Sequence, residues 1–173
     1  MRQAVFLDRD GVINEVLSKR VRFVNRPSHF FLLDGVGEAI HLLNRANWPV
    51  FVVTNQGGVG LGYMSEASLQ EVHQEMIRQL AAYEARITAI AYCAHAPHAG
   101  CACRKPGSKM LEDLAVRYDV DLAASVMVGD RQADIEAGKK AGCTTIGIGQ
   151  NVTGADAHFP SLRAAVPWIL SNT

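Results

Sequence analysis

The sequence predicts a doubly wound α/β fold with a mostly parallel sheet, and three observations support this. Five runs of apolar, β-favouring residues are nearly continuous, as in strands that are covered on both faces. Segments with a helical spacing of apolar residues separate these runs, and this βαβα order favours a parallel sheet. No linker, internal repeat or low-complexity stretch interrupts the 173 residues, so we expect a single domain over 1–173.

The expected elements follow in chain order. Strands are predicted over 3–8, 49–54, 87–93, 124–128 and 143–148. Helices are predicted over 35–47, 65–84, 107–118, 131–141 and 160–171. The second of these helices has the clearest pattern, because Ser65 can cap it. Its apolar residues recur at helical spacing: Leu69, Val72, Met76 and Leu80. The segment 14–34 is too long for a plain turn, so we expect it to form a flap.

The composition argues against some classes of partner. Lysine plus arginine number 17, as do aspartate plus glutamate, so the formal net charge is zero and nothing favours nucleic acid or an anionic membrane. No apolar run approaches the ~20 residues of a membrane helix, and no signal pattern precedes the first strand. We therefore expect a cytoplasmic protein. The sequence does not reveal the oligomeric state, and a monomer is the default expectation.

Polar side chains follow three of the predicted strands at the point where each strand ends. They are Asp8 and Asp10 after the first strand, Thr54 and Asn55 after the second, and Asp130 after the fourth. Ligands of doubly wound sheets bind beyond the carboxyl ends of the strands. These distant segments are therefore expected to meet at one edge of the sheet and to form a site there.

The acids Asp8 and Asp10 suit phosphoryl transfer. A carboxylate can attack a phosphoryl group in line with the leaving oxygen if a divalent cation neutralises both. Asp8 could attack and form an aspartyl phosphate, while Asp10 could protonate the leaving alcohol and later deprotonate water. Asp130 could supply another metal ligand, and oxygen ligands suit Mg²⁺. Taken alone, Asp-x-Asp-Gly is equally consistent with a strand-to-turn corner, and Asp130 with a helix cap.

Other residues near the strand ends could bind phosphate or substrate. Thr54 and the backbone amides beside it could hold phosphate oxygens, although a turn role would also explain Thr54. Lys105 could neutralise phosphate as a point charge, or it could be a surface residue. Asn55 and Arg104 flank these positions and could hydrogen-bond substrate hydroxyls or a second phosphate. Arg131 could do the same or form a surface ion pair.

A cluster of cysteines and one histidine begins at the end of the third predicted strand. Its members are Cys93, His95, Cys101 and Cys103. In a cytoplasmic chain such a cluster favours metal binding over disulfides. Three thiolates and one imidazole make a closed tetrahedral set that suits structural Zn²⁺. We expect the ion to hold a zinc loop over 93–103 rigid beside Lys105 and to take no part in catalysis. The alternative is a set of free thiols in a mobile loop.

Taken in order, four motifs resemble those of the haloacid dehalogenase (HAD) superfamily of phosphatases. They are Asp8-x-Asp10-Gly-Val, Thr54-Asn-Gln, Lys105-Pro and Gly129-Asp130-x-x-x-Asp134. The resemblance covers essentially the whole chain and implies a HAD-like Rossmannoid sheet. It implies that Asp8 is the nucleophile and Asp10 the general acid and base, and that Thr54 and Lys105 bind the transferring phosphoryl group. Mg²⁺ would be held by the carboxylates of Asp8 and Asp130 and the backbone carbonyl of Asp10.

The cysteine loop resembles that of D-glycero-D-manno-heptose 1,7-bisphosphate and histidinol-phosphate phosphatases, a subgroup with no large cap domain. Segments 24–36 and 54–66 are similar to the heptose group, but Leu61 stands where those enzymes commonly carry arginine. The short zinc loop is closer to the histidinol-phosphate type. The resemblance implies a Mg²⁺-dependent phosphomonoesterase that acts on a small phosphorylated metabolite, the heptose bisphosphate, with histidinol phosphate as the alternative substrate. A catalytically silent zinc-binding interaction module is the alternative from another class.

Overall fold

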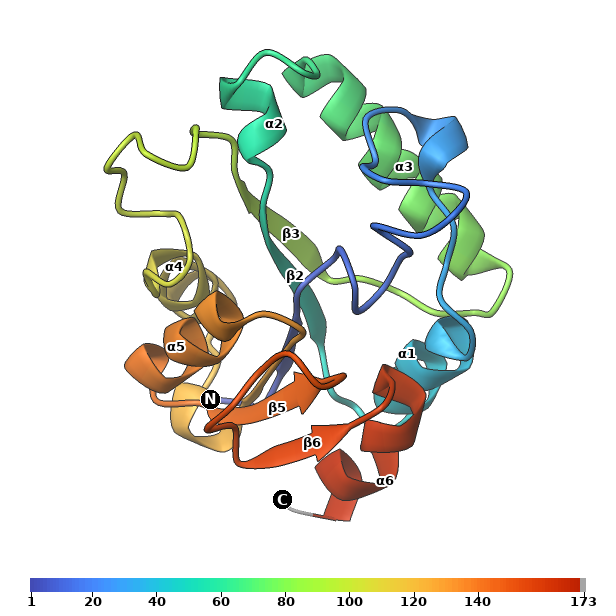
Figure 1. Cartoon of the computed structure of the whole chain (residues 1–173). Coiled ribbons are helices and arrows are strands. Elements are labelled where there is room, and N and C mark those ends of the chain that lie inside the picture. Colours follow the sequence, from blue (N-terminus) through green and yellow to red (C-terminus); the bar gives the residue numbers. More distant parts are fainter. Residues whose placement is uncertain (172–173) are drawn as a thin grey trace.

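The computed structural model describes residues 1–171 of the chain. Six strands form one sheet in the order β3-β2-β1-β4-β5-β6 (Figure 1). Their bounds are β1 Val5–Leu7, β2 Val50–Asn55, β3 Ala89–Cys93, β4 Val126–Gly129, β5 Thr144–Ile148 and β6 Ala157–Phe159. Each neighbouring pair is parallel, and the direction of strand addition reverses at β1, which lies between β2 and β4. The predicted doubly wound parallel sheet is confirmed.

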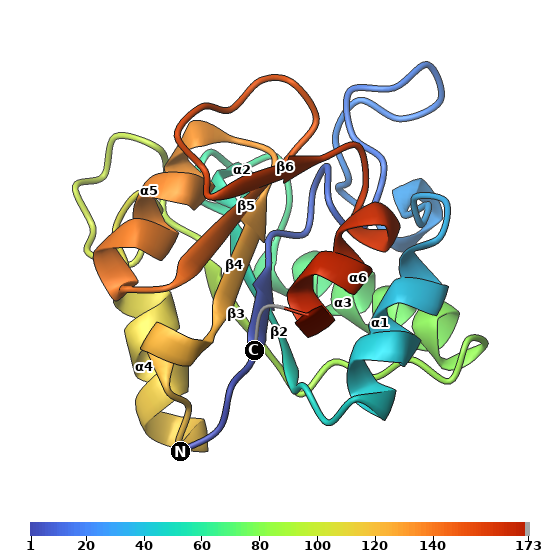
Figure 2. The same ribbon diagram turned by 90° about the horizontal axis from the view of Figure 1, so that it is seen from below.

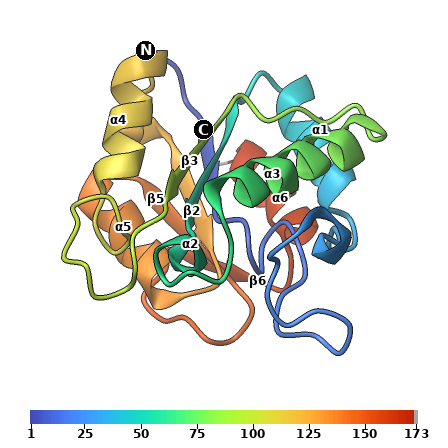
Figure 3. The same cartoon turned by 90° about the horizontal axis from the view of Figure 1, so that it is seen from above.

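Helices cover both faces of this sheet. They are α1 Val36–Arg45, α2 Gly57–Gly60, α3 Glu66–Ala81, α4 Lys109–Tyr118, α5 Gln132–Ala141 and α6 Leu162–Ser171. Figure 2 and Figure 3 show α4 and α5 on one face and α1, α3 and α6 on the other. The buried side chains form one apolar cluster on each face, in agreement with this three-layer arrangement.

The alternation of side chains along the central strands supplies both cores. Val5 and Leu7 of β1 lie in the cluster that α1, α3 and α6 cover, whereas Phe6 lies in the cluster under α4 and α5. In the second cluster, Phe6 stacks on Phe51 of β2 with ring centroids 5.3 Å apart. Phe51 also contacts Tyr118 of α4 at 5.1 Å. Because successive residues of a strand point to opposite faces, two covered faces require the continuous apolar runs seen in the sequence.

One strand and one short α-helix of the structure were not expected from the sequence. The strand β6 was not predicted, because it has only three residues at the sheet edge and none of them is buried. The one-turn helix α2 was not predicted either, because its sequence Gly-Gly-Val-Gly has low helix propensity. The last helix begins at Leu162 and not at 160, and the other expected elements occur with ends shifted by a few residues.

The carboxyl ends of the parallel strands share one edge of the sheet, and the loops after β1, β2 and β4 lie there. The segment 14–34 also lies there, and isolated bridges pair Asn14 with Asp10 and with Leu32. No insertion as large as a cap domain separates the elements over residues 1–171. Among the helices of these residues, none combines the length and the apolar character that crossing a bilayer requires.

The Phe51 ring provides a test of the core under α4 and α5. Phe51 is fully buried between Phe6 and Tyr118, so Phe51→Ala should lower the free energy of unfolding by about 3–5 kcal/mol. Val116→Ala is the control on α4, because Val116 is 86% exposed, and it should change stability by less than about 0.5 kcal/mol. Urea denaturation followed by circular dichroism measures both. Equal effects of the two substitutions would contradict the described packing.

Candidate active site

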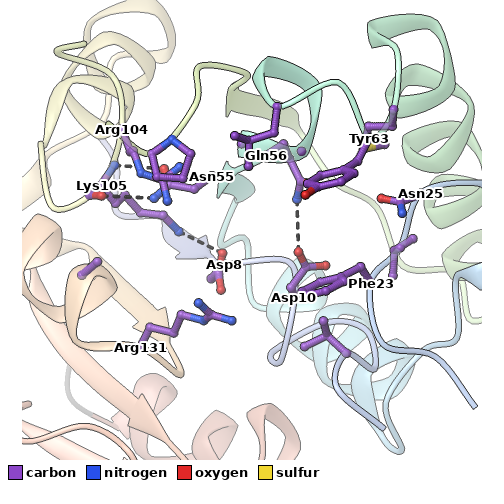
Figure 4. Close-up of a pocket in the computed structure, with 18 of the residues that line it drawn as sticks. Asp8, Asp10, Phe23, Asn25, Asn55, Gln56, Tyr63, Arg104, Lys105 and Arg131 are labelled. Atoms are coloured by element: carbon purple, nitrogen blue, oxygen red, sulfur yellow. Dashed lines mark hydrogen bonds and ion pairs between the residues drawn. The ribbon is translucent and has the colours of Figure 1, made fainter. Parts of the chain in front are cut away.

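A cavity of about 650 Å³ opens at the carboxyl edge of the sheet (Figure 4). It is lined by six of the residues that the sequence singled out, namely Asp8, Asp10, Asn55, Arg104, Lys105 and Arg131. Phe23 and Asn25 of the segment 14–34 line another part of it, opposite Arg104 in Figure 4. The strand-end residues and the expected flap therefore surround one space. The two remaining candidates, Thr54 and Asp130, do not line it.

Lys105 connects the residue that follows β1 with the helix α5 that follows β4. Its Nζ donates hydrogen bonds to Asp8 Oδ1 at 2.9 Å, to Asp134 Oδ1 at 2.6 Å and to the Val53 carbonyl oxygen at 2.8 Å. The three ammonium protons are thus all used, and Lys105 is only 3% exposed. Lys105 is a buried structural charge of the site and not a surface residue.

The acids around Lys105 carry more negative charge than this one ammonium balances. Carboxylate oxygens of Asp8, Asp130 and Asp134 all lie within 4.8 Å of one another. Burial raises the pKa of Asp8 well above its ordinary value, Lys105 opposes this, and Asp134 adds to it. Burial and Asp134 likewise raise the pKa of Asp130. If all three carboxylates are ionised, the single lysine leaves two negative charges in excess, and a divalent cation would offset them.

Asp130 and Asp134 have different contacts, although both follow β4. Asp134 is fully engaged, because its Oδ1 accepts from Lys105 and its Oδ2 accepts from the Arg131 backbone N–H at 3.0 Å. Asp130 Oδ1 is buried and has no hydrogen-bond partner among the described residues. An unsatisfied buried carboxylate oxygen is costly. Asp130, which does not cap α5, therefore has an oxygen available to a metal ion, whereas Asp134 holds Lys105 in place.

The second acid of the motif, Asp10, is held by neighbours that the sequence analysis did not single out. Its Oδ1 accepts from Arg9 Nη2 at 2.9 Å, from Arg9 Nε at 3.1 Å and from Asn14 Nδ2 at 3.0 Å. Its Oδ2 accepts from Gln56 Nε2 at 3.3 Å. Burial acts to raise the pKa of Asp10, but Arg9 and the hydrogen bonds outweigh it and bring the pKa below its ordinary value. Asp8 and Asp10 therefore lie in electrostatically opposite environments.

The end of β2 fixes the loop that carries Lys105. Asn55 Nδ2 donates to the Lys105 carbonyl oxygen at 3.1 Å, and the Lys105 backbone N–H donates to Asn55 Oδ1 at 2.9 Å. Thr54 is fully buried, and its Oγ1 accepts from Gln56 Nε2 at 3.0 Å, which leaves its own hydroxyl proton free to be donated. Asn55 thus holds the backbone of Lys105 in place, and Thr54 lies behind the cavity wall.

Two arginines line the cavity beside these acids. Arg104 Nη1 is buried and has no hydrogen-bond acceptor among the described residues. Figure 4 shows Arg104 next to Asn55 and Lys105, and Arg131 on the other side of Asp8. Arg131 makes no ion pair within residues 1–171, so the surface-pair alternative has no support there. Free guanidinium groups on either side of a carboxylate can bind anionic or hydroxylated ligands.

The four residues of the expected zinc loop lie close together. Cys93 Sγ is 3.4 Å from His95 Nδ1 and 3.4 Å from Cys101 Sγ, and His95 Nδ1 is 3.2 Å from Cys103 Sγ. A tetrahedral Zn²⁺ with bonds of about 2.3 Å to sulfur would hold such atoms about 3.5–3.8 Å apart. All four cysteines of the chain are free thiols, and Cys143 is buried away from this cluster. The donor set and spacing fit one zinc ion.

The fold and the site define the class of the protein as a HAD-like hydrolase. Residues 102–166 match the family model described as HAD-hydrolase-like. This segment contains Lys105, Asp130 and Asp134, which make up the second half of the ordered motifs.

Similarity to curated proteins identifies a more specific family within this class. D-glycero-beta-D-manno-heptose-1,7-bisphosphate 7-phosphatase of Bordetella bronchiseptica is 43% identical over 80% of this chain and 76% of its own length. The D-glycero-D-manno-heptose-1,7-bisphosphate 7-phosphatase of Thermosynechococcus vestitus is 34% identical over 99% of this chain and 97% of its own length. The crystal structure of D,D-heptose 1,7-bisphosphate phosphatase from B. bronchiseptica, complexed with magnesium and phosphate, covers both chains completely with a TM-score of 0.89 at 36% identity. The chain belongs to this family of HAD phosphatases and is a phosphoric monoester hydrolase.

Two glycines with the same backbone conformation test how closely the Asp130 carboxylate packs. Gly11 and Gly62 have φ of +87° and +85°, but a Cβ at Gly11 would lie 1.9 Å from Asp130 Oδ2, whereas nothing lies within 4 Å at Gly62. Both alanine substitutions carry the cost of a left-handed backbone, about 1 kcal/mol. Gly11→Ala should lower the free energy of unfolding by about 2 kcal/mol more, because it displaces the half-buried Asp130 carboxylate. Thermal unfolding measures the difference, and equal losses would contradict the close contact.

Proposed function

We propose that this chain is a Mg²⁺-dependent phosphomonoesterase whose preferred substrate is D-glycero-D-manno-heptose 1,7-bisphosphate. The observation that carries the proposal is the meeting, in one cavity, of Asp8 with its ammonium partner Lys105 and of a differently held acid, Asp10. The names of the relatives support the choice of substrate.

In the proposed reaction Asp8 is the nucleophile. Its carboxylate attacks phosphorus, the bond between phosphorus and the leaving oxygen breaks, and an aspartyl phosphate forms. Lys105 lies against Asp8 and would neutralise the phosphoryl oxygens as they arrive. The free hydroxyl proton of Thr54 and the backbone amides that follow β2 are the further donors to phosphate that we propose.

Asp10 is the proposed general acid and base. It would give a proton to the leaving alcohol oxygen and would later take one from the water that attacks the aspartyl phosphate. Water then breaks the bond between phosphorus and Asp8, so that Asp8 returns as a carboxylate and Asp10 as an acid. The two acids have separate partners, because Asp8 contacts a lysine and Asp10 an arginine and two amides, so each is held in place independently of the other.

Mg²⁺ would be held by the carboxylates of Asp8 and Asp130 and by the backbone carbonyl of Asp10. The unpartnered Oδ1 of Asp130 and the excess of negative charge around Lys105 support this ligand set. The crystal structure of the related phosphatase was determined with magnesium and phosphate, which supports the choice of metal. When bound, the cation would neutralise the attacking carboxylate and the phosphoryl group.

Recognition of the rest of the substrate is assigned to three side chains on the cavity wall. Arg104, with its unpartnered Nη1, and Arg131, on the other side of Asp8, would bind sugar hydroxyls or the second phosphate, and Asn55 is placed beside Arg104. Guanidinium groups suit a second phosphate because they can donate two parallel hydrogen bonds. Leu61 also lines the cavity, so an arginine at this position is not available for that task.

Asp8→Asn tests the proposed nucleophile. The amide cannot attack phosphorus, so Mg²⁺-dependent phosphate release from the heptose bisphosphate should fall by at least about 10³-fold. Asp113→Asn is the control, because Asp113 is an exposed acid on α4 that pairs with Lys109. Its rate should equal that of wild type. An undiminished rate for Asp8→Asn would remove Asp8 as nucleophile, and a wild type without phosphate release would favour a silent zinc module.

A comparison of kcat/KM for the heptose bisphosphate and for histidinol phosphate tests the substrate. We expect the bisphosphate to be preferred because two arginines line the cavity around Asp8. A preference for histidinol phosphate would overturn this choice of substrate and leave the phosphatase reaction in place.

Cys101→Ser tests the structural zinc. We propose that Zn²⁺ bound by Cys93, His95, Cys101 and Cys103 braces the loop that leads to Lys105. The wild type purified under reducing conditions should contain about one zinc per chain, and Cys101→Ser should lose it and unfold at a lower temperature. Cys143→Ala is the matched control outside the cluster and should keep the metal. Wild-type protein free of zinc by elemental analysis would contradict the proposal.

A further inference from the structure

Arg9 is a buried cation that none of the proposed steps uses. It is 0% exposed, it is the largest of the fully buried side chains, and it does not line the cavity. Burying a guanidinium is costly unless its donors are satisfied by well-placed acceptors. Its satisfied donors all point to two groups, Asp10 and His73. Arg9 is therefore not in a position to contact substrate. Its role must be to hold the two groups that it hydrogen-bonds, Asp10 and His73.

The hydrogen bonds of Asp10 make its two oxygens inequivalent. Oδ1 receives Nε and Nη2 of Arg9 and Nδ2 of Asn14, so three donors already crowd it. An oxygen with three donors has no room for a proton of its own. Oδ2 has only the longer contact with Gln56 Nε2, at 3.3 Å, and Figure 4 shows this contact from the cavity side. The oxygen that can exchange a proton with substrate or water is therefore Oδ2.

His73 fixes the far side of the Arg9 guanidinium. Arg9 Nη1 lies 3.1 Å from His73 Nε2. Arginine can only donate, so His73 must accept with Nε2 and is a neutral imidazole. Burial and the Arg9 charge lower the pKa of His73 to about 4, in agreement with this form. His73 is a buried residue of α3, and its ring packs against Tyr92 of β3 with centroids 5.9 Å apart. The contact links α3 to the acid of the site.

We propose that Arg9 and His73 are positioning residues that aim Oδ2 of Asp10 at the leaving oxygen. The inference rests on the proposed function, in which Asp10 moves the proton. His73 holds Nη1, which fixes the plane of the guanidinium, and Nε and Nη2 then hold Oδ1 of Asp10. Oδ2 is left facing the cavity at a fixed angle. Neither residue contacts substrate.

The step that this positioning serves is cleavage of the ester bond. As Asp8 bonds to phosphorus, the electron pair of the breaking P–O bond moves to the leaving oxygen, which takes the proton from Oδ2 of Asp10. A poor leaving group such as a sugar alcohol needs this proton, whereas p-nitrophenolate leaves without it. Misplacing Oδ2 should therefore slow the two classes of ester unequally. A loss of stability alone should lower kcat/KM for both esters by the same factor.

The test compares kcat/KM of the full chain for the heptose bisphosphate and for p-nitrophenyl phosphate. His73→Leu removes the acceptor for Nη1 and should lower kcat/KM for the sugar ester at least about tenfold more than for the aryl ester. His73→Gln restores an acceptor oxygen on a side chain of similar reach, so it should keep most of the wild-type ratio. Met76→Ala is the control on α3, because it loosens the same helix in the core and Met76 is not among the hydrogen-bond partners of Arg9.

Arg9→Lys is the second variant and serves if His73→Leu does not fold. It keeps the charge but cannot hold both Oδ1 and His73 in one plane, so the same selective loss is expected. An equal fall for both esters in these variants, or the selective loss in Met76→Ala, would overturn the positioning role alone. A wild type that hydrolyses neither ester would overturn the proposed function and this inference with it.

Discussion

The Lys105 ammonium is shared by two buried carboxylates, Asp8 and Asp134, and the geometry of the site depends on this contact. It links the end of β1 to the start of α5 through a residue that comes from neither. Breaking one partner of such a buried group would leave an uncompensated charge, which typically costs about 3–5 kcal/mol. The excess negative charge of the ionised carboxylates would favour a bound cation, so the charge imbalance that weakens the fold would also prepare the proposed metal site.

The position of Lys105 depends in turn on two supports from different parts of the chain. Asn55 holds its backbone in both directions, so that β2 and the loop before α4 cannot separate. The cysteine cluster lies on the same loop, and a Cβ at Gly60 of α2 would lie 2.4 Å from the Ala96 backbone nitrogen. The loop is thus packed against α2 as well as tied to β2. A structural metal there would act on catalysis only through Lys105 and Arg104, by keeping their backbone in place.

The sequence alone predicted the parallel sheet and the meeting of Asp8, Asp10, Asn55 and Lys105, because these follow from strand order and from where each strand ends. The contacts that give these residues different surroundings could not be predicted in the same way. Arg9 looks like a solvated arginine between two acids, and only packing against His73, 64 positions away, makes it a buried one. Thr54 was expected to bind phosphate and is still proposed to do so, but its full burial depends on how β2 is covered and does not follow from the sequence. A strand of three residues, such as β6, is too short to show the alternation of apolar and polar residues by which a strand is predicted.

The central claim is that β1 delivers Asp8 as a nucleophile, and direct trapping of the covalent intermediate tests it best. The protein would be mixed with Mg²⁺ and substrate, quenched during turnover and treated with borohydride, which reduces an acyl phosphate to an alcohol and so converts its aspartate to homoserine. Mass spectrometry of the peptide that contains Asp8 should then find homoserine at position 8, and only when substrate was present. Homoserine at another aspartate, or an unmodified Asp8 peptide during rapid turnover, would contradict the account.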